Sequence, residues 1–93
     1  MRLTLLVYQL YLPGSHSLKD KRKVLKSILD RLVTRLKVSV AEVGYQDQWQ
    51  RATLAVAWVA ADGSGTDARV TAVDKVVSLS GEVEVLQVDK SDY

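Results

Sequence analysis

The sequence contains no cysteine, no phenylalanine and only one histidine among its 93 residues. Without cysteine, neither a disulfide framework nor a thiolate metal site can form. A single histidine is too few for a histidine-rich metal site and excludes the usual zinc patterns. We therefore expect neither a bound metal nor another cofactor.

Long apolar runs are also missing, since no stretch approaches the ~20 residues that a bilayer span requires. Tyr8, Gln9 and Tyr11 interrupt the N-terminal MRLTLLVYQLYL, and no small-residue cleavage site follows, so a secretory signal peptide is not predicted. With 47% hydrophobic and 26% charged residues, the composition is typical of a globular protein. We expect one domain over residues 1–93, in a cytoplasmic protein with no membrane partner.

Positive charge is concentrated in one segment, although the formal net charge is only +2. Between Lys19 and Lys37 eight basic residues face only Asp20 and Asp30, so this segment carries +6 and the rest of the chain −4. Such polarisation predicts one electropositive element on the surface.

Hydrophobic periodicity predicts the order strand, helix, strand, strand, helix, strand. The four strands are expected at Met1–Leu12, Lys37–Gly44, Arg51–Ala60 and Glu82–Val88. Leucine spacing predicts a first helix from Leu18 to Leu36 with Ser17 as its N-cap, and valine spacing a second from Thr66 to Leu79. Residues 88–93 are expected to form a frayed tail.

This order is that of a ferredoxin-like α+β sandwich, in which a four-stranded antiparallel sheet carries two helices on one face. The other face then has no cover. The alternation in the first strand predicts that Leu3, Leu5 and Val7 face the helices. The open face is predicted to form an interface, for which the candidate residues are Leu6, Tyr8, Leu10 and Trp58. Exposed apolar patches usually mark interfaces, so we expect a homodimer, with a monomer screened by loops as the alternative.

The stretch PGSHSLKDKRKVLK, residues 13–26, joins the first strand to the first helix. Lysines at the start of a helix oppose its macrodipole, which prefers carboxylates there, so their placement suggests a use. We predict an anion- or nucleic-acid-binding surface made of Ser15, His16, Ser17, Lys19, Lys21, Lys23 and Lys26. In the alternative interpretation these lysines form a solvated face and the histidine is structural.

A structural ion pair is predicted between Arg22 and Glu42. On a helical wheel Arg22 lies about 40° from Leu18, within the leucine sector. Glu42 continues the inward alternation of its own strand. Trp49, in the polar turn GYQDQW, is expected to cap the edge of the sheet, with a base-stacking platform as the alternative.

The carboxylates do not predict a catalytic centre. They are scattered through loops and helix starts, where acidic residues serve as caps. Glycine-rich phosphate-binding loops are absent, and so is the basic-glycine-aromatic signature of RNA-recognition modules. We therefore expect that the protein is not an enzyme.

Two strings, HSLKDKR at residues 16–22 and SVAEV at 39–43, resemble the YlxP-like family, a small bacterial domain-of-unknown-function family. The resemblance spans Met1 to about Val88 and implies a ferredoxin-like fold in a cytoplasmic protein. Family members are often encoded beside translation initiation and ribosome-maturation factors, which implies RNA or the ribosome as a partner.

Three functional hypotheses follow. The preferred one is docking on RNA or the ribosome through the segment Ser15–Lys26. The second is a homo-oligomeric protein-interaction or scaffold module that uses the open sheet face. The third is an enzyme or small-ligand sensor that binds a phosphorylated metabolite with the same loop.

Overall fold

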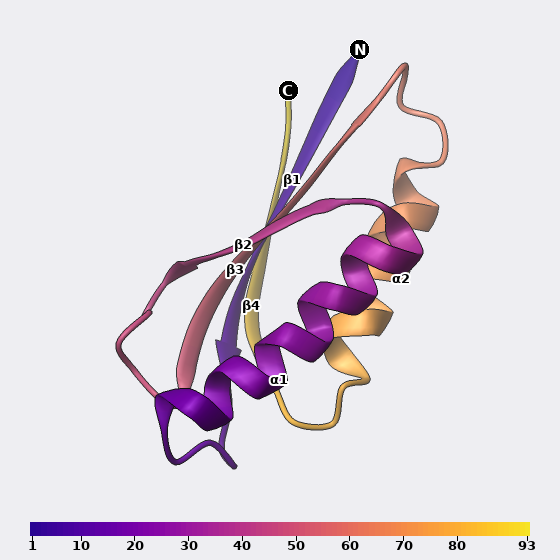
Figure 1. Cartoon of the computed structure of the whole chain (residues 1–93). Coiled ribbons are helices and arrows are strands. Elements are labelled where there is room, and N and C mark those ends of the chain that lie inside the picture. The colour runs from indigo at the N-terminus through magenta and orange to yellow at the C-terminus, as the bar shows by residue number, and fades with distance from the viewer.

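The computed structural model describes all 93 residues. The elements follow the predicted order (Figure 1). They are β1 (Arg2–Tyr11), α1 (Leu18–Arg31), the π-helical turn η1 (Leu32–Leu36), β2 (Ser39–Gly44), β3 (Arg51–Ala60), α2 (Thr66–Ser78) and β4 (Glu84–Asp92). Together α1 and η1 cover the predicted first helix, and Ser17 caps it by accepting a hydrogen bond from the Asp20 N–H.

The four strands form one sheet in the order β2-β3-β1-β4, and every neighbouring pair is antiparallel. Both helices lie on the same face of this sheet (Figure 1). The predicted ferredoxin-like α+β sandwich is therefore confirmed. The molecule is elongated, with principal extents of 42 × 21 × 17 Å.

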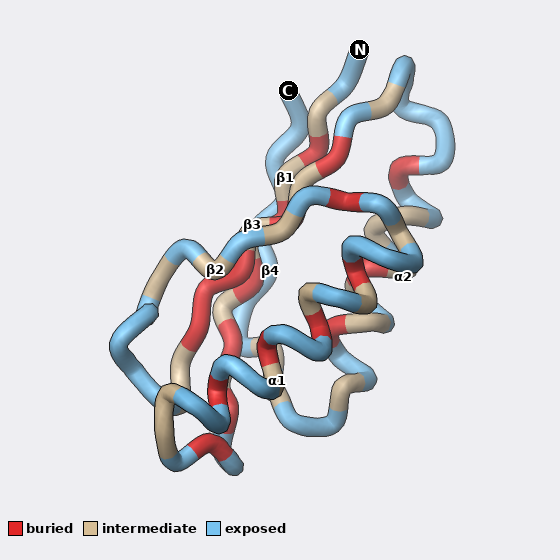
Figure 2. Tube along the Cα trace, viewed as in Figure 1, coloured by how far each residue is buried: buried red, intermediate tan, exposed pale blue.

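The two faces of β1 are the reverse of the prediction. Leu6, Tyr8 and Leu10 are at most 1% exposed and belong to the core beneath the helices, together with Trp58 at 5%. Figure 2 shows buried and half-buried positions alternating along β1. The predicted interface residues thus face the helices, and the side chains that alternate with them on β1 lie on the open face.

The polar contacts of β1 explain why the helix face was misassigned. The Tyr8 hydroxyl donates to the Asp74 carboxylate of α2, so this polar group has a hydrogen-bond partner although the tyrosine ring lies in the core. Thr4, 1% exposed, donates through Oγ1 to Asp92 Oδ1 at 3.0 Å. Because both alternating sets are apolar, periodicity alone could not reveal that the set with polar tips faces the helices.

The C-terminal residues 88–93 are not a frayed tail. Strand β4 extends to Asp92 and pairs with β1 as far as Thr4. The Tyr93 N–H donates to the Leu3 carbonyl at 2.8 Å, and the Leu3 N–H donates back at 3.0 Å. These ladder bonds join backbone groups, so a polar side-chain pattern does not weaken them.

A β-bulge interrupts the pairing of β2 with β3, where the register shifts between Glu42 and Gly44, and Gly44 pairs with Thr53 beyond it. Gly44 lies so close to β3 that an added Cβ would approach Thr53 Oγ1 to 2.8 Å. That hydroxyl in turn donates to Gln9 Oε1 at 2.7 Å. A glycine is therefore required where β2 approaches Thr53 of β3 this closely.

Candidate functional site

The buried cation of α1 is Lys21 rather than the predicted Arg22. Lys21 is 1% exposed, and its Nζ lies 2.8 Å from Glu42 Oε2. Arg22 is exposed and forms no ion pair. An inward-facing carboxylate at Glu42 was correctly predicted, but its partner was not. Because Lys21 is inaccessible, it also cannot belong to the predicted anion-binding surface.

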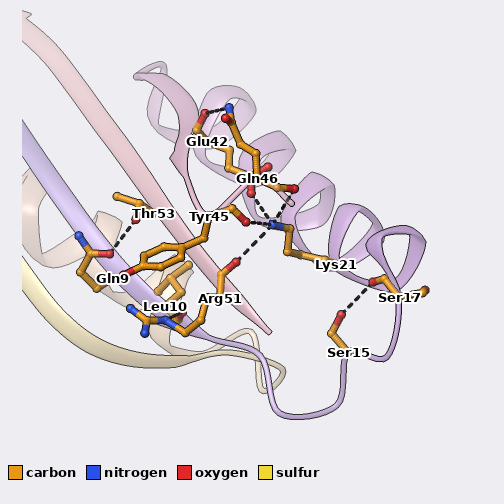
Figure 3. Close-up of polar contacts among 10 residues, drawn as sticks. All are labelled: Gln9, Leu10, Ser15, Ser17, Lys21, Glu42, Tyr45, Gln46, Arg51 and Thr53. Atoms are coloured by element: carbon orange, nitrogen blue, oxygen red, sulfur yellow. Dashed lines mark hydrogen bonds and ion pairs between the residues drawn. The ribbon is translucent and has the colours of Figure 1, made fainter. Parts of the chain in front are cut away.

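Lys21 ties α1 to the turn between β2 and β3 (Figure 3). Its Nζ donates to the carbonyls of Tyr45 at 2.7 Å, Arg51 at 3.2 Å and Gln46 at 3.4 Å. Tyr45 has φ 58°, a left-handed conformation that is unfavourable for a tyrosine. The Arg51 guanidinium stacks 4.4 Å from the centre of the Tyr45 ring. The buried ammonium and this stacked pair together hold a strained turn in place.

The helical repeat of α1 itself places Lys21 on the inward side. At 100° per residue Lys21 lies about 40° from Leu25 and about 20° from Ile28, so it falls between two core residues. Arg22 lies about 60° from Leu25, at the border of the same sector, and its long side chain reaches solvent. The basic residues on either side of Lys21 are exposed, so in the sequence Lys21 resembles one member of a continuous surface run.

The start of α1 is capped by the chain itself. Ser15 is 3% exposed and donates to the Ser17 carbonyl at 3.2 Å. Ser17 Oγ accepts from the Asp20 N–H at 3.0 Å, and the His16 N–H donates to Asp20 Oδ2 at 3.0 Å. The serine hydroxyls and the Asp20 carboxylate thus occupy the position where the predicted surface would hold an anion.

The other predicted basic residues remain on the surface. Lys19, Lys23 and Lys26 are exposed, and the helical repeat places them along the outer side of α1, with Arg22 beside them. Lys26 Nζ forms an ion pair with Asp30 Oδ2 at 2.7 Å. The hydrogen bond and then the charge of Asp30 raise the pKa of Lys26. We call these four residues the α1 cationic row.

The open face of the sheet carries a ridge beside a trough. The side chains of Leu3, Leu5 and Val7 project from β1 and are half-buried, and we call them the sheet ridge. In the register of the sheet they lie opposite Val59, Ala57 and Ala55 of β3, and Ala41 of β2 lies opposite Ala55. The alanine trough consists of Ala41, Ala55 and Ala57. Polar side chains on β4 border the ridge on its other side: Gln87, Asp89 and Ser91.

The remaining predicted or polar residues do not form a cluster of metal ligands. No group of three or more carboxylate or imidazole side chains converges on a position that could hold a metal ion. Trp49, which was expected to cap the sheet edge, is 53% exposed. None of the helices combines the length and the apolar character needed to cross a lipid bilayer.

The fold resembles several solved structures at low sequence identity. LarC2, the C-terminal domain of a cyclometallase involved in the synthesis of the NPN cofactor of lactate racemase, superposes with a TM-score of 0.53 at 10% identity; the match covers 100% of this chain and 55% of that one. A dimeric ferredoxin-like protein from an uncultured marine organism gives 0.52 at 9% identity, covering 99% and 92%. SnoaB, a cofactor-independent oxygenase from Streptomyces nogalater, gives 0.50 at 9% identity, covering 98% and 90%. These likenesses concern the fold alone.

The sequence comparisons are more specific. The chain is 40% identical over 68 residues to the "Uncharacterized protein YlxP" of Bacillus subtilis (strain 168), a match that covers 73% of this chain and 74% of that relative. Residues 3–90 match the family described as protein of unknown function DUF503. The chain therefore belongs to the DUF503 family.

Proposed function

We propose that the chain is a non-enzymatic, cytoplasmic interaction module that forms a homodimer through its open sheet face. The sheet ridge and the alanine trough lie side by side on this face, and this juxtaposition carries the proposal. Three apolar side chains in a row without a covering element favour association, because burying them removes apolar area from water.

The ridge and the trough make the face complementary to itself. A two-fold axis parallel to the strands, midway between β1 and β3, would place each β1 above the β3 of the partner. The partner's Leu5 would then lie above Ala57, and its Val7 above Ala55, because these pairs share a level in the sheet. Large side chains opposite small ones are the arrangement in which two sheets interdigitate closely.

The size of the face is compatible with a stable dimer. Four strands make it about 19 Å wide and, at about 30 Å along the strands, give it a flat area of about 600 Å² before side chains roughen it. A standard interface buries about 800 Å² per partner. The dimeric ferredoxin-like neighbour of similar fold gives further support.

The proposal is tested by measuring the dissociation constant of the dimer by sedimentation equilibrium for the unchanged chain and for two variants. Leu5→Lys should weaken the dimer at least ten-fold, because a charge would be buried at the interface. Ala57→Leu should also weaken it, because it fills the trough. Nonspecific hydrophobic association would instead increase in Ala57→Leu, because this variant exposes more apolar surface. A weaker dimer in Ala57→Leu therefore distinguishes the proposed docking from nonspecific association.

Val33→Lys is the control, because Val33 is an exposed apolar residue of η1, 49% accessible, on the side of the helices. Its replacement should leave the dissociation constant unchanged. The proposal fails if the unchanged chain sediments as a monomer at all concentrations, or if Ala57→Leu strengthens association.

The α1 cationic row favours a second function, docking on RNA or the ribosome. With Lys21 buried, seven basic residues of the segment from Lys19 to Lys37 still face only two acidic ones, Asp20 and Asp30. Lys19, Arg22 and Lys23 are exposed and form no ion pair, so they are available to phosphates. The hydroxyls of Ser15 and Ser17 do not take part, because they are used in capping, whereas the His16 side chain is exposed and forms no hydrogen bond.

A charge-matched comparison tests this second function. Lys19→Glu/Lys23→Glu should abolish the retention of total cellular RNA on a filter, whereas Lys75→Glu/Lys90→Glu, with the same change in net charge on α2 and β4, should not. Retention by the unchanged chain should fall with salt by about one unit of log–log slope per phosphate contact. Equal losses in the two double variants, or no salt dependence, would refute it.

A further inference from the structure

The edge of β3 that faces β2 is covered over only part of its length. Strand β2 begins at Ser39, which lies opposite Ala57, so residues 58–60 of β3 have no neighbouring strand on this side. The chain leaves the sheet there because Lys37 has φ 54° and its N–H donates to the Val33 carbonyl of η1 at 3.1 Å. One corner of the sheet therefore has a short free edge.

The main chain of Val59 has no hydrogen-bond partner at this free edge. Leu3, which lies opposite Val59 on β1, uses its own N–H and C=O to bond with Tyr93 of β4. In an antiparallel ladder the N–H and C=O of Val59 then point away from β1, toward the side where β2 is missing. Neither β2 nor a loop reaches them. One free donor and one free acceptor thus lie side by side, as a further strand would require.

Two cavities follow the free edge. One, of about 290 Å³, lies between the end of β3 and the start of α2, and the other, of about 180 Å³, lies between β3 and the start of β2. Both are lined by Trp58, Val59 and Arg69, so they adjoin one another. Trp58 is 5% exposed and belongs to the core, which gives the cavities a fixed wall. The free edge therefore runs along a preformed groove, which we call the β3 edge groove.

The charges of the β3 edge groove favour an acidic occupant. The guanidinium of Arg69 lies 5.9 Å from the centre of the Trp58 ring and forms no ion pair. Lys37 lines the smaller cavity, is exposed and also forms no ion pair. No carboxylate lines either cavity. Two cations without a counter-ion beside a free strand edge are complementary to a carboxylate on an added strand.

We propose that the β3 edge groove binds an extended, acidic segment of another polypeptide, which adds to β3 as a short antiparallel strand. The residue opposite Val59 donates its N–H to the Val59 carbonyl and accepts from the Val59 N–H. Its two neighbours then point to the helix side of the sheet, as Trp58 does, and a carboxylate there bonds to the Arg69 guanidinium. The groove lies at the edge of the sheet, so this binding depends neither on the dimer nor on the α1 cationic row.

The test is a titration of 15N-labelled protein with the acetylated and amidated peptide TEVET, whose central valine is flanked by two glutamates. The Val59 amide and the Arg69 Nε should shift together and saturate. The uncharged peptide TQVQT should bind about ten-fold more weakly, because a hydrogen bond between two charged groups is lost. TEVET with an N-methylated central valine should cause no saturable shift at Val59, because it lacks the donor for the Val59 carbonyl.

The variant Arg69→Gln should bind TEVET only as weakly as the unchanged chain binds TQVQT. Its thermal unfolding should be unchanged, because Arg69 forms no ion pair, so a loss of binding would not reflect unfolding. Lys75→Gln is the matched control, because it removes an exposed charge from the same helix and should leave the titration unchanged. The proposal is overturned if Val59 shows no saturable shift, if TEVET and TQVQT bind equally, if N-methylation has no effect, or if the shifts are confined to α1.

Discussion

Replacing Lys21 by methionine should destabilise the fold more than any other single change of a lysine. Methionine keeps the length of the side chain but leaves the carbonyls of Tyr45, Gln46 and Arg51 without their donor. It also leaves the Glu42 carboxylate without its counter-ion. Breaking a buried pair from one side costs about 3–5 kcal/mol, mostly because a charge is stranded.

The Glu42 side chain is 22% exposed and remains partly hydrated, so we expect the lower end of that range, about 3 kcal/mol. For a chain of this size each kcal/mol lowers the melting temperature by about 4–8 °C, which gives a fall of about 12–24 °C. Native domains are stable by about 5–15 kcal/mol, so the variant should still fold at low temperature.

Urea and thermal unfolding followed by circular dichroism measure this effect. Arg22→Met is the matched control, because it changes the neighbouring exposed cation and should alter the unfolding free energy by less than about 0.5 kcal/mol. The double variant Lys21→Met/Glu42→Leu should recover part of the loss, because no charge is stranded. Equal unfolding free energies for Lys21→Met and Arg22→Met would refute the assignment of Lys21 as the buried cation.

Two further predictions concern the sheet. Burial, together with the hydrogen bond and charge of Asp74, raises the pKa of Tyr8 well above its usual value near 10. Because the pKa of Tyr8 is higher in the folded state than in the unfolded state, Tyr8 contributes stability below pH 10 that is lost as the pH rises above 10. The variant Tyr8→Phe should therefore show a smaller fall in unfolding free energy at alkaline pH. An unchanged dependence of the unfolding free energy on pH would contradict this. In hydrogen exchange, the amides of Leu3 and Tyr93 should be protected as β1 is, whereas a Tyr93 amide that exchanges at the rate of a free peptide would show that β4 ends earlier.

Much of the architecture could be predicted from local patterns. Alternating apolar residues and leucine and valine spacing were sufficient for the order of strands and helices, and Ser17 was correctly predicted as the cap of α1. These signals depend on neighbours along the chain, so they survive without knowledge of the tertiary contacts.

The candidate sites could be predicted only in part. Lys19, Lys23 and Lys26 lie on the surface as expected, because their spacing puts them on one side of a helix. The role predicted for Ser15 was wrong, because its hydroxyl is buried and bonded to the Ser17 carbonyl, whereas the role of the exposed His16 side chain stays a prediction.

The amino-acid sequence by itself determined the ferredoxin-like order of elements and the cationic side of the first helix, since both follow from residue spacing. Only the tertiary structure decided which face of β1 lies under the helices, which groups pair with the buried cation and where β4 ends. Two apolar sets of side chains alternate on β1, and the set that faces the helices is the one whose Tyr8 hydroxyl donates to Asp74 of α2. Likewise the helical repeat of α1 places Lys21 inward, but the three carbonyls and Glu42 that bind its ammonium come from β2, β3 and the turn between them, so no pattern within α1 identifies them.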